Sequence, residues 1–222
     1  MDIERNIRDI EQRIAGACER AGRSQEEVTL IAVTKTVAPH AIEAAFKSGI
    51  RHFGENRVQE AKPKIEELES LRKHVTWHMV GHLQTNKAKT ALSIFDIIHS
   101  IDSLRLARIL SDHTKKKLPV LIEVNVAAEP TKSGLLLHEV DEAVRDIGRL
   151  PNLEIEGLMT IAPLVNDAEE VRPVFRRLRH LGEALGLKHL SMGMTDDFEV
   201  AIEEGATLVR IGRAIFGERT TP

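Results

Sequence analysis

Apolar residues follow a helical pattern at the start of the chain and a β-type pattern after it. Ile3, Ile7, Ile10, Ile14 and Ala17 recur at spacings of three and four residues, which predicts an amphipathic helix that ends near Gly22. Short β-type runs then alternate with segments of helical character. We predict eight strands, at 29–35, 51–55, 75–81, 95–101, 119–126, 153–160, 189–193 and 207–211. The predicted helices between them cover 39–48, 57–70, a segment from 86, 103–116, 137–149, 167–185 and 196–204.

This alternation predicts the fold class. Strands that alternate with helices pair in parallel through crossover connections. Eight such units are the number that closes a (β/α)8 barrel, whereas the alternative, an open doubly wound sheet, commonly uses fewer strands. No linker or low-complexity tract interrupts the pattern. We therefore expect an α/β protein with a TIM-type barrel, a single domain over residues 1–222, whose extra N-terminal helix packs on the outside or covers the bottom.

Composition and charge narrow the classes of function. A net charge of -3 gives no overall basic field for nucleic acid. Cys18 is the single cysteine, so no internal disulfide can form, which is typical of a reducing cytosol. The first ten residues are too charged for a secretory signal, and no apolar stretch approaches the roughly 20 residues of a membrane span. We expect a cytoplasmic protein without a membrane or nucleic-acid partner. A monomer is expected because no large apolar face is left over.

The stretch TLIAVTKT places a lysine, Lys35, at the end of an apolar strand. Burying an ammonium is costly. One interpretation is an edge lysine that extends its amine to solvent. The other is a desolvated lysine that serves as a nucleophile.

The carboxyl ends of the last two strands carry a candidate anion site. In (β/α)8 barrels the chemistry lies at these ends, and the loops after strands seven and eight often bind phosphate. The GMTDD stretch before a helix offers backbone N–H groups, and Gly212 and Arg213 follow the last strand. Asp196 and Asp197 argue against an anion, and the alternative is that they only cap the helix.

A reactive lysine, a phosphate site and an arginine at the barrel mouth, Arg210, together suit a phosphate-bearing aldehyde such as pyridoxal 5'-phosphate (PLP). The sequence resembles the pyridoxal phosphate homeostasis proteins, which are small relatives of the N-terminal barrel of alanine racemase. The resemblance covers nearly the whole chain and rests on AVTKT, HFGENRVQE, WHMVGHLQTNK, IEVNV with KSG, GLMTIAP, LSMGMTDDFEVAIEEGAT and VRIGRAIFGER.

The resemblance implies roles for single residues. Lys35 is expected to form the internal aldimine, Arg210 to face the pyridine nitrogen, and Asn56 to lie beside the ring. The expected phosphate site surrounds Met194, Thr195, Gly212 and Arg213, with Ser191 nearby. Thr195 stands where many relatives have serine, which keeps the hydroxyl. Arg213 stands where many have threonine or serine, so its backbone N–H is a safer expectation than its side chain.

Catalysis is not expected to be strong. Arg210 has no acceptor for a ring-nitrogen proton, which weakens carbanion chemistry. The sequence has no tyrosine for the second base of alanine racemase, and we expect that enzyme's further β domain to be missing as well. We expect a PLP carrier in cofactor homeostasis, with apo PLP enzymes as candidate recipients. The alternatives are a PLP-dependent racemase or lyase with His82 as base, and a Schiff-base aldolase that uses Lys35 without a cofactor. No metal site is expected at His78 and His82, because their spacing does not converge at a strand end.

Overall fold

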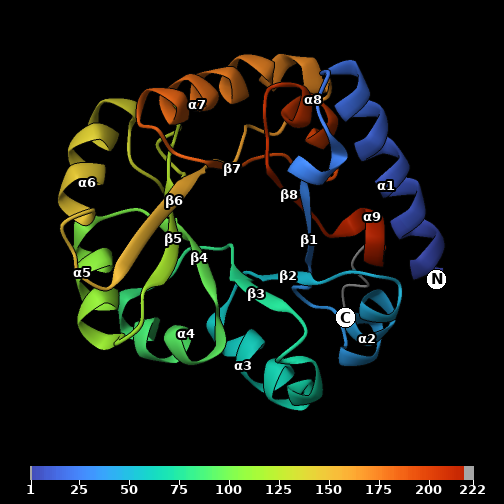
Figure 1. Cartoon of the computed structure of the whole chain (residues 1–222), viewed down its shortest axis with the longest axis horizontal. Coiled ribbons are helices and arrows are strands. Elements are labelled where there is room, and N and C mark those ends of the chain that lie inside the picture. Colours follow the sequence, from blue (N-terminus) through green and yellow to red (C-terminus); the bar gives the residue numbers. More distant parts are fainter. Residues whose placement is uncertain (1, 218–222) are drawn as a thin grey trace.

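Eight parallel strands close into a barrel (Figure 1), as the sequence predicts. The computed structural model describes residues 2–217. Each strand pairs with the next one in the chain, and β8 pairs with β1 to close the ring. The strands are β1 (Thr29–Val33), β2 (His52–Glu55), β3 (Thr76–Met79), β4 (Ile97–Ile101), β5 (Leu118–Glu123), β6 (Leu153–Met159), β7 (His189–Ser191) and β8 (Leu208–Ile211).

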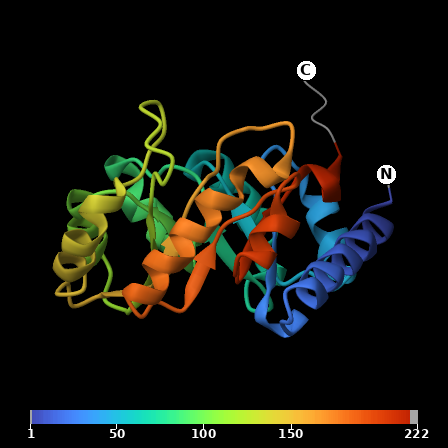
Figure 2. The ribbon, with the colours of Figure 1, turned by 90° about the horizontal axis from the view of Figure 1, so that it is seen from above.

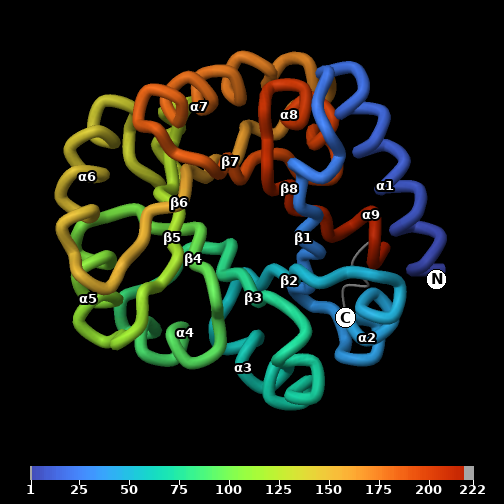
Figure 3. Tube along the Cα trace, viewed as in Figure 1, coloured from blue at the N-terminus to red at the C-terminus, as the bar shows by residue number. Residues whose placement is uncertain are grey.

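Helices surround the barrel and cover the outer face of every strand (Figure 3). They are α1 (Ile3–Arg20), α2 (Pro39–Lys47), α3 (Val58–Glu67), α4 (Ala88–Ile94), α5 (Leu104–His113), α6 (Val140–Ile147), α7 (Arg172–Ala184), α8 (Phe198–Glu203) and α9 (Arg213–Phe216). This ring of helices on parallel strands confirms the TIM-type barrel. The predicted domain range 1–222 and the end of the VRIGRAIFGER motif, Glu218 and Arg219, extend outside the described residues.

Helix α1 packs on the outside of the ring, against α8, α9 and α2, and not across the barrel bottom (Figures 1 and 2). Its start is fixed by Asp2, whose side chain accepts a hydrogen bond from the Arg5 backbone N–H at 2.9 Å. The predicted apolar stripe faces inward, and Cys18 is buried beside it. Arg13 reaches α8, where it forms an ion pair with Glu199 at 2.7 Å.

Several predicted elements end earlier in the structure. Strand β5 ends at Glu123 and not beyond Asn125, because the Asn125 side chain turns to the following loop and donates to the Glu129 carbonyl at 2.8 Å. Helix α3 ends at Glu67 because Leu68 leaves helical geometry, and a separate 3-10 turn follows. Helix α9 was not predicted, since four residues are too few to show a helical period.

The barrel interior has an apolar centre. Ile31, Leu121, Met159 and Leu208 come from strands on different sides of the ring and form a cluster of their own, separate from the core under the helices. Such a packed centre leaves chemistry to the ends of the barrel, as in other folds of this type.

Candidate functional site

The predicted site residues gather in one sector of the barrel. Lys35 follows β1, Asn56 follows β2, Ser191 ends β7, and Arg210 lies in β8. These four strands are neighbours in the ring, in the order β7, β8, β1, β2. Because parallel strands share one carboxyl end, the loops after them open at the same mouth.

Lys35 sits in a tight turn directly after β1. The turn is closed by a hydrogen bond of 3.0 Å from the Val37 N–H to the Thr34 carbonyl. Thr36 has a φ of 62°, which is unusual for a β-branched residue and marks local strain. Lys35 itself is half-buried, so it is neither fully exposed nor fully sequestered. Strain of this kind persists only where the surroundings enforce it.

An ionic cluster of two α3 side chains and one from the end of β2 enforces that geometry. Lys64 is 8% exposed, and its Nζ donates to the Thr34 carbonyl and to Glu55 Oε1, both at 2.7 Å. The Thr34 hydroxyl also donates to Glu55 Oε1 at 2.7 Å. Glu60 accepts from the Thr36 backbone N–H and from Lys64. Both neighbours of Lys35 are therefore anchored to charged side chains, and we call Glu55, Glu60 and Lys64 the α3 clamp.

Arg210 is held by neutral partners. Its guanidinium donates from one terminal nitrogen to Ser191 Oγ at 2.7 Å and from the other to the Thr160 carbonyl at 2.8 Å. Arg210 is 4% exposed, and burial lowers its pKa to about 10, although the charges of Asp197 and Glu123 act in the opposite direction. The guanidinium therefore stays charged near neutral pH. Its two bonds use two of the five N–H donors that an arginine carries.

Asn56 has an unused acceptor. Its side-chain Oδ1 is buried and has no hydrogen-bond partner within residues 2–217. Gly81, two residues after β3, lies against the Asn56 backbone so closely that a Cβ there would come within 2.4 Å of the Asn56 carbonyl oxygen. The glycine in the predicted WHMVGHLQTNK motif therefore permits this close approach.

The loop after β7 differs from the expected anion site. Helix α8 begins at Phe198, and the Asp197 side chain does not cap it but accepts from the Met194 N–H at 2.6 Å. Asp196 also does not cap the helix; its carboxylate pairs with Arg213 across the rim. The alternative interpretation, that both aspartates only cap α8, is therefore wrong. Burial raises the pKa of Asp197, so that its negative charge is disfavoured there.

The other predicted residues of this loop lie close by. Thr195 is half-buried between Met194 and the two aspartates, and Met194 is partly exposed. Gly212 follows β8, and a Cβ there would meet the Val33 carbonyl oxygen at 3.0 Å. Gly193 has a φ of 92° and faces Phe198, so a side chain at this position would be both strained and crowded.

Sequence reasoning missed two features of the barrel interior. Glu123, inside the apolar run PVLIEVNV, is 5% exposed with one unpartnered carboxylate oxygen, and burial raises its pKa to about 7. Three histidines, His52, His78 and His99, stand in a row behind Ser191. A polar residue in the middle of an apolar strand is the signal that points to both.

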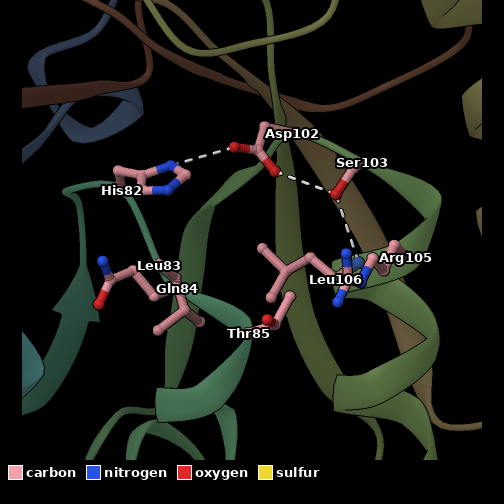
Figure 4. Close-up of a pocket in the computed structure, with 8 residues that line it drawn as sticks. All are labelled: His82, Leu83, Gln84, Thr85, Asp102, Ser103, Arg105 and Leu106. Carbon is pink, nitrogen blue, oxygen red and sulfur yellow. Dashed lines mark hydrogen bonds and ion pairs between the residues drawn. The ribbon is translucent and has the colours of Figure 1, made fainter.

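A cleft lies beside the mouth, between the loops after β3 and β4 (Figure 4). It has a volume of about 450 Å³ and is lined by His82, Gln84, Asp102, Ser103 and Arg105, with Thr85, Leu83 and Leu106. His82 Nδ1 lies 3.1 Å from Asp102 Oδ2, and half of the His82 side chain is exposed. A histidine oriented by a carboxylate has the geometry of a general base.

Residues 2–217 contain neither a membrane-spanning helix nor a metal-binding cluster. None of their helices is both long and apolar enough to cross a membrane. Within the same residues no group of three or more histidine, cysteine or acidic side chains is arranged to hold a metal ion.

Comparisons with known proteins establish the family. The family model of the alanine racemase N-terminal domain matches residues 3–220. The chain is 46% identical over 217 residues to the pyridoxal phosphate homeostasis protein of Aquifex aeolicus (strain VF5), an alignment that covers 94% of each chain. The chain belongs to the pyridoxal phosphate homeostasis protein family.

Solved structures agree with this family assignment. PipY of Synechococcus elongatus PCC7942, solved with PLP bound, matches with a TM-score of 0.80 and 36% identity, over 94% of this chain and 100% of PipY. Alanine racemase of Clostridium difficile 630 matches with a TM-score of 0.75 at 13% identity, over 99% of this chain and 57% of the racemase. The racemase shares the fold of this homeostasis-family barrel. The predicted family and fold are both confirmed.

Proposed function

We propose that this chain binds PLP and takes part in cytoplasmic PLP homeostasis as a carrier, through a single barrel domain over residues 1–222. The proposal depends above all on one observation, which is that Lys35 and Arg210 come from paired strands at one barrel mouth. Register aligns Arg210 with Ile31, four residues before Lys35. An amine and a guanidinium on adjacent strands can hold the two ends of one planar ring. The family is named for PLP, and its member PipY was solved with PLP bound.

The residues present fit this group. Lys35 would be the covalent anchor for the aldehyde, and its turn is held rigid by the α3 clamp. The unpartnered Oδ1 of Asn56 would accept a hydrogen bond from a donor at the ring edge. Arg210 would donate to the ring nitrogen, with Ser191 fixing its orientation.

The phosphate would lie at the loops after β7 and β8. Gly212 permits close approach of backbone N–H groups, and Thr195 supplies a hydroxyl beside them. The Met194 N–H would have to leave Asp197 to serve the phosphate, which the raised pKa of Asp197 makes easier. Arg213 would contribute its backbone N–H, because its side chain is paired with Asp196.

We propose that the chain does not turn over amino acids at ordinary enzyme rates. Bound PLP supplies an electron sink, and this sink is strongest when the ring nitrogen is protonated. A charged guanidinium cannot accept that proton, so Arg210 opposes it. The sequence also has no tyrosine to act as a second base.

A PLP-dependent racemase or lyase is the second candidate. The His82–Asp102 pair, 3.1 Å apart beside the mouth, is the observation that favours it. Turnover of D- or L-amino acids by the PLP-loaded protein, abolished in His82→Ala, would establish this candidate and overturn the carrier. Equal, negligible turnover in both proteins supports the carrier.

The experiment that tests PLP binding is an absorbance titration of the full chain with PLP. We expect a visible band in the parent and in Lys62→Ala, an exposed lysine of α3, but none in Lys35→Ala. Borohydride reduction followed by peptide mapping should place the added mass on the peptide that contains Lys35. A band of equal strength in Lys35→Ala would overturn the anchor. No band in any of the proteins would favour the Schiff-base aldolase.

We also propose that a monomer delivers PLP to apo enzymes at the barrel mouth. Within residues 2–217 the exposed large apolar side chains, Leu136, Ile161, Leu164 and Met194, all lie on loops after β5, β6 and β7, at the same end as Lys35. Light scattering should give the mass of one chain. Transfer to an apo PLP enzyme should slow in Leu164→Ser, whose residue is 94% exposed, if these loops contact the recipient.

A further inference from the structure

Three histidines form a continuous hydrogen-bonded row through the barrel interior. His52 Nδ1 lies 3.0 Å from His78 Nε2, and His78 Nδ1 lies 2.8 Å from His99 Nε2. His99 Nδ1 is 2.9 Å from Ser191 Oγ, which accepts from Arg210. The row crosses β2, β3, β4 and β7, so it links the guanidinium to the first residue of β2, at the amino-terminal end of the barrel.

The histidines are neutral, which fixes how many hydrogen bonds each can donate. His78 and His99 are fully buried, and His52 is half-buried. Burial lowers the pKa of all three, that of His78 to about 3. A neutral imidazole has one donor nitrogen and one acceptor nitrogen. Each ring in the row must therefore donate on one side and accept on the other.

The arginine selects the direction of the row. A guanidinium only donates, so Ser191 Oγ accepts from Arg210 and keeps its own proton to give away. Among residues 2–217, His99 Nδ1 is the acceptor that this hydroxyl reaches. His99 then carries its proton on Nε2 and donates to His78, and His78 in turn donates from Nε2 to His52.

We propose that His99, His78 and His52 are positioning residues for Arg210, joined in a one-directional row in which every ring accepts at Nδ1 and donates at Nε2. Each acceptor nitrogen points back towards the guanidinium, so the ring dipoles present their negative ends to the cation. Hydrogen bonds in such a series strengthen one another. The row stands in for a directly bonded carboxylate, because it stabilises the buried charge and fixes Ser191. Within residues 2–217 the guanidinium donates to neutral groups, and Asp197 and Glu123 act on it only through their charges. Its role in cofactor binding rests on the proposed function.

The first test needs neither a variant nor the cofactor. Nitrogen-15 NMR of the full chain, labelled at histidine, distinguishes protonated from unprotonated ring nitrogens. Near neutral pH we expect His78 and His99 to be protonated at Nε2 and to accept at Nδ1, with couplings between the paired nitrogens. His113, exposed on α5 and bonded to the Ile109 carbonyl through Nδ1, is the internal control with the opposite tautomer. Protonation of His99 or His78 at Nδ1 overturns the proposal.

The second test compares variants of His99 by PLP affinity. His99→Leu removes the acceptor of the Ser191 hydroxyl proton and the donor to His78 Nδ1, whereas His99→Gln retains one donor and one acceptor. We expect the dissociation constant for PLP to rise roughly ten- to a hundred-fold in His99→Leu and by much less in His99→Gln. His189→Leu is the matched control, since His189 lies on β7 but bonds to Thr207 and not to the row. Equal weakening in His99→Leu and His189→Leu would overturn the proposal.

The two tests separate failure of the row from failure of PLP binding. If the parent does not bind PLP but shows the expected tautomers, the proposed function is wrong and the row remains. If the parent binds PLP and its tautomers are reversed, the row is wrong and the cofactor assignment remains. A His99→Leu chain that does not fold leaves the tautomers of the parent as the deciding measurement.

Discussion

The two cations next to the site are held in opposite ways. Lys64 lies among carboxylates, with Glu55 at 2.7 Å and Glu60 at 3.3 Å. Arg210 is equally buried, but both of its hydrogen-bond partners within residues 2–217 are neutral. In one region carboxylates bond directly to the cation. In the other the bonded groups are neutral, and Asp197 and Glu123 act on the cation only through their charges.

The difference suits a different proposed role for each cation. A neutralised Lys64 acts on geometry, because it fixes the strained turn that presents Lys35. The bonded partners of Arg210 orient its guanidinium but carry no negative charge that would neutralise it. A buried ion pair is costly to break, whereas a buried cation without a partner carboxylate is costly to keep. The cation without a bonded carboxylate, Arg210, is therefore the one that would contact the proposed ligand.

Lys64→Met removes the cation of the α3 clamp and should have the largest effect on stability. The change leaves the Glu55 carboxylate buried and without its cation, which typically costs about 3–5 kcal/mol of unfolding free energy. Burial already raises the pKa of Glu55, so the loss should be smaller at acidic pH, where this carboxyl is protonated in the variant. Urea unfolding of the variant and the parent at two pH values measures both effects.

Lys62→Met is the matched control for this change. Lys62 lies on the same helix, and its ion pair with Glu66, at 3.7 Å, is exposed on both sides. Exposed pairs contribute less than about 1 kcal/mol. Equal losses in Lys62→Met and Lys64→Met would show that the α3 clamp does not carry the stability assigned to it.

Glu123→Gln tests the charge balance in the Arg210 region. Burial raises the pKa of Glu123 from its usual 4.5 to about 7, even though Arg210 pulls it down. Because the pKa is raised in the folded state, the unfolded chain loses this proton at a lower pH than the folded chain does. The free energy of unfolding of the parent therefore falls as pH rises from about 4.5 to about 7. The difference corresponds to about 3 kcal/mol.

Glutamine cannot ionise, so the variant should escape that loss. Relative to the parent, Glu123→Gln should gain about 3 kcal/mol between pH 4 and pH 8. Denaturant unfolding across this range measures the gain. A constant difference between the two proteins would mean that Glu123 is ionised as readily in the folded chain as in the unfolded one, and that the Arg210 region is better compensated than its contacts indicate.

The sequence predicted the barrel because its signals are local and repeated. Each strand is an apolar run followed by a helix, and eight repeats leave few arrangements. Element ends were less predictable: β5 ends at Glu123 because the Asn125 side chain bonds to Glu129 in the loop that follows, which the apolar pattern of the strand does not show. Residues whose side chains suggest a chemical role, such as Lys35 and Arg210, could be placed near strand ends from the sequence.

The residues that hold them were missed for a physical reason. Lys64 lies on the apolar face of α3 beside Ala61 and Ile65, where a lysine reads as a solvated surface residue until its partners on β1 and β2 are known. The histidine row depends on the register of four strands. Such contacts are set by closure of the barrel and not by spacing along the chain.

Arg213→Ala tests the rim, where the smallest effect is expected. Arg213 and Asp196 form an ion pair whose side chains are 52% and 64% exposed, so its loss should cost less than about 1 kcal/mol. If only the backbone N–H of residue 213 serves the phosphate, the dissociation constant for PLP should change by no more than about twofold, which corresponds to less than half a kcal/mol. Asp196→Ala is the informative partner, since it removes a carboxylate from the rim and frees the guanidinium. A large loss of affinity in Arg213→Ala would instead mean that this arginine leaves Asp196 when PLP arrives, and that the rim supplies a second cation that reaches the ligand directly.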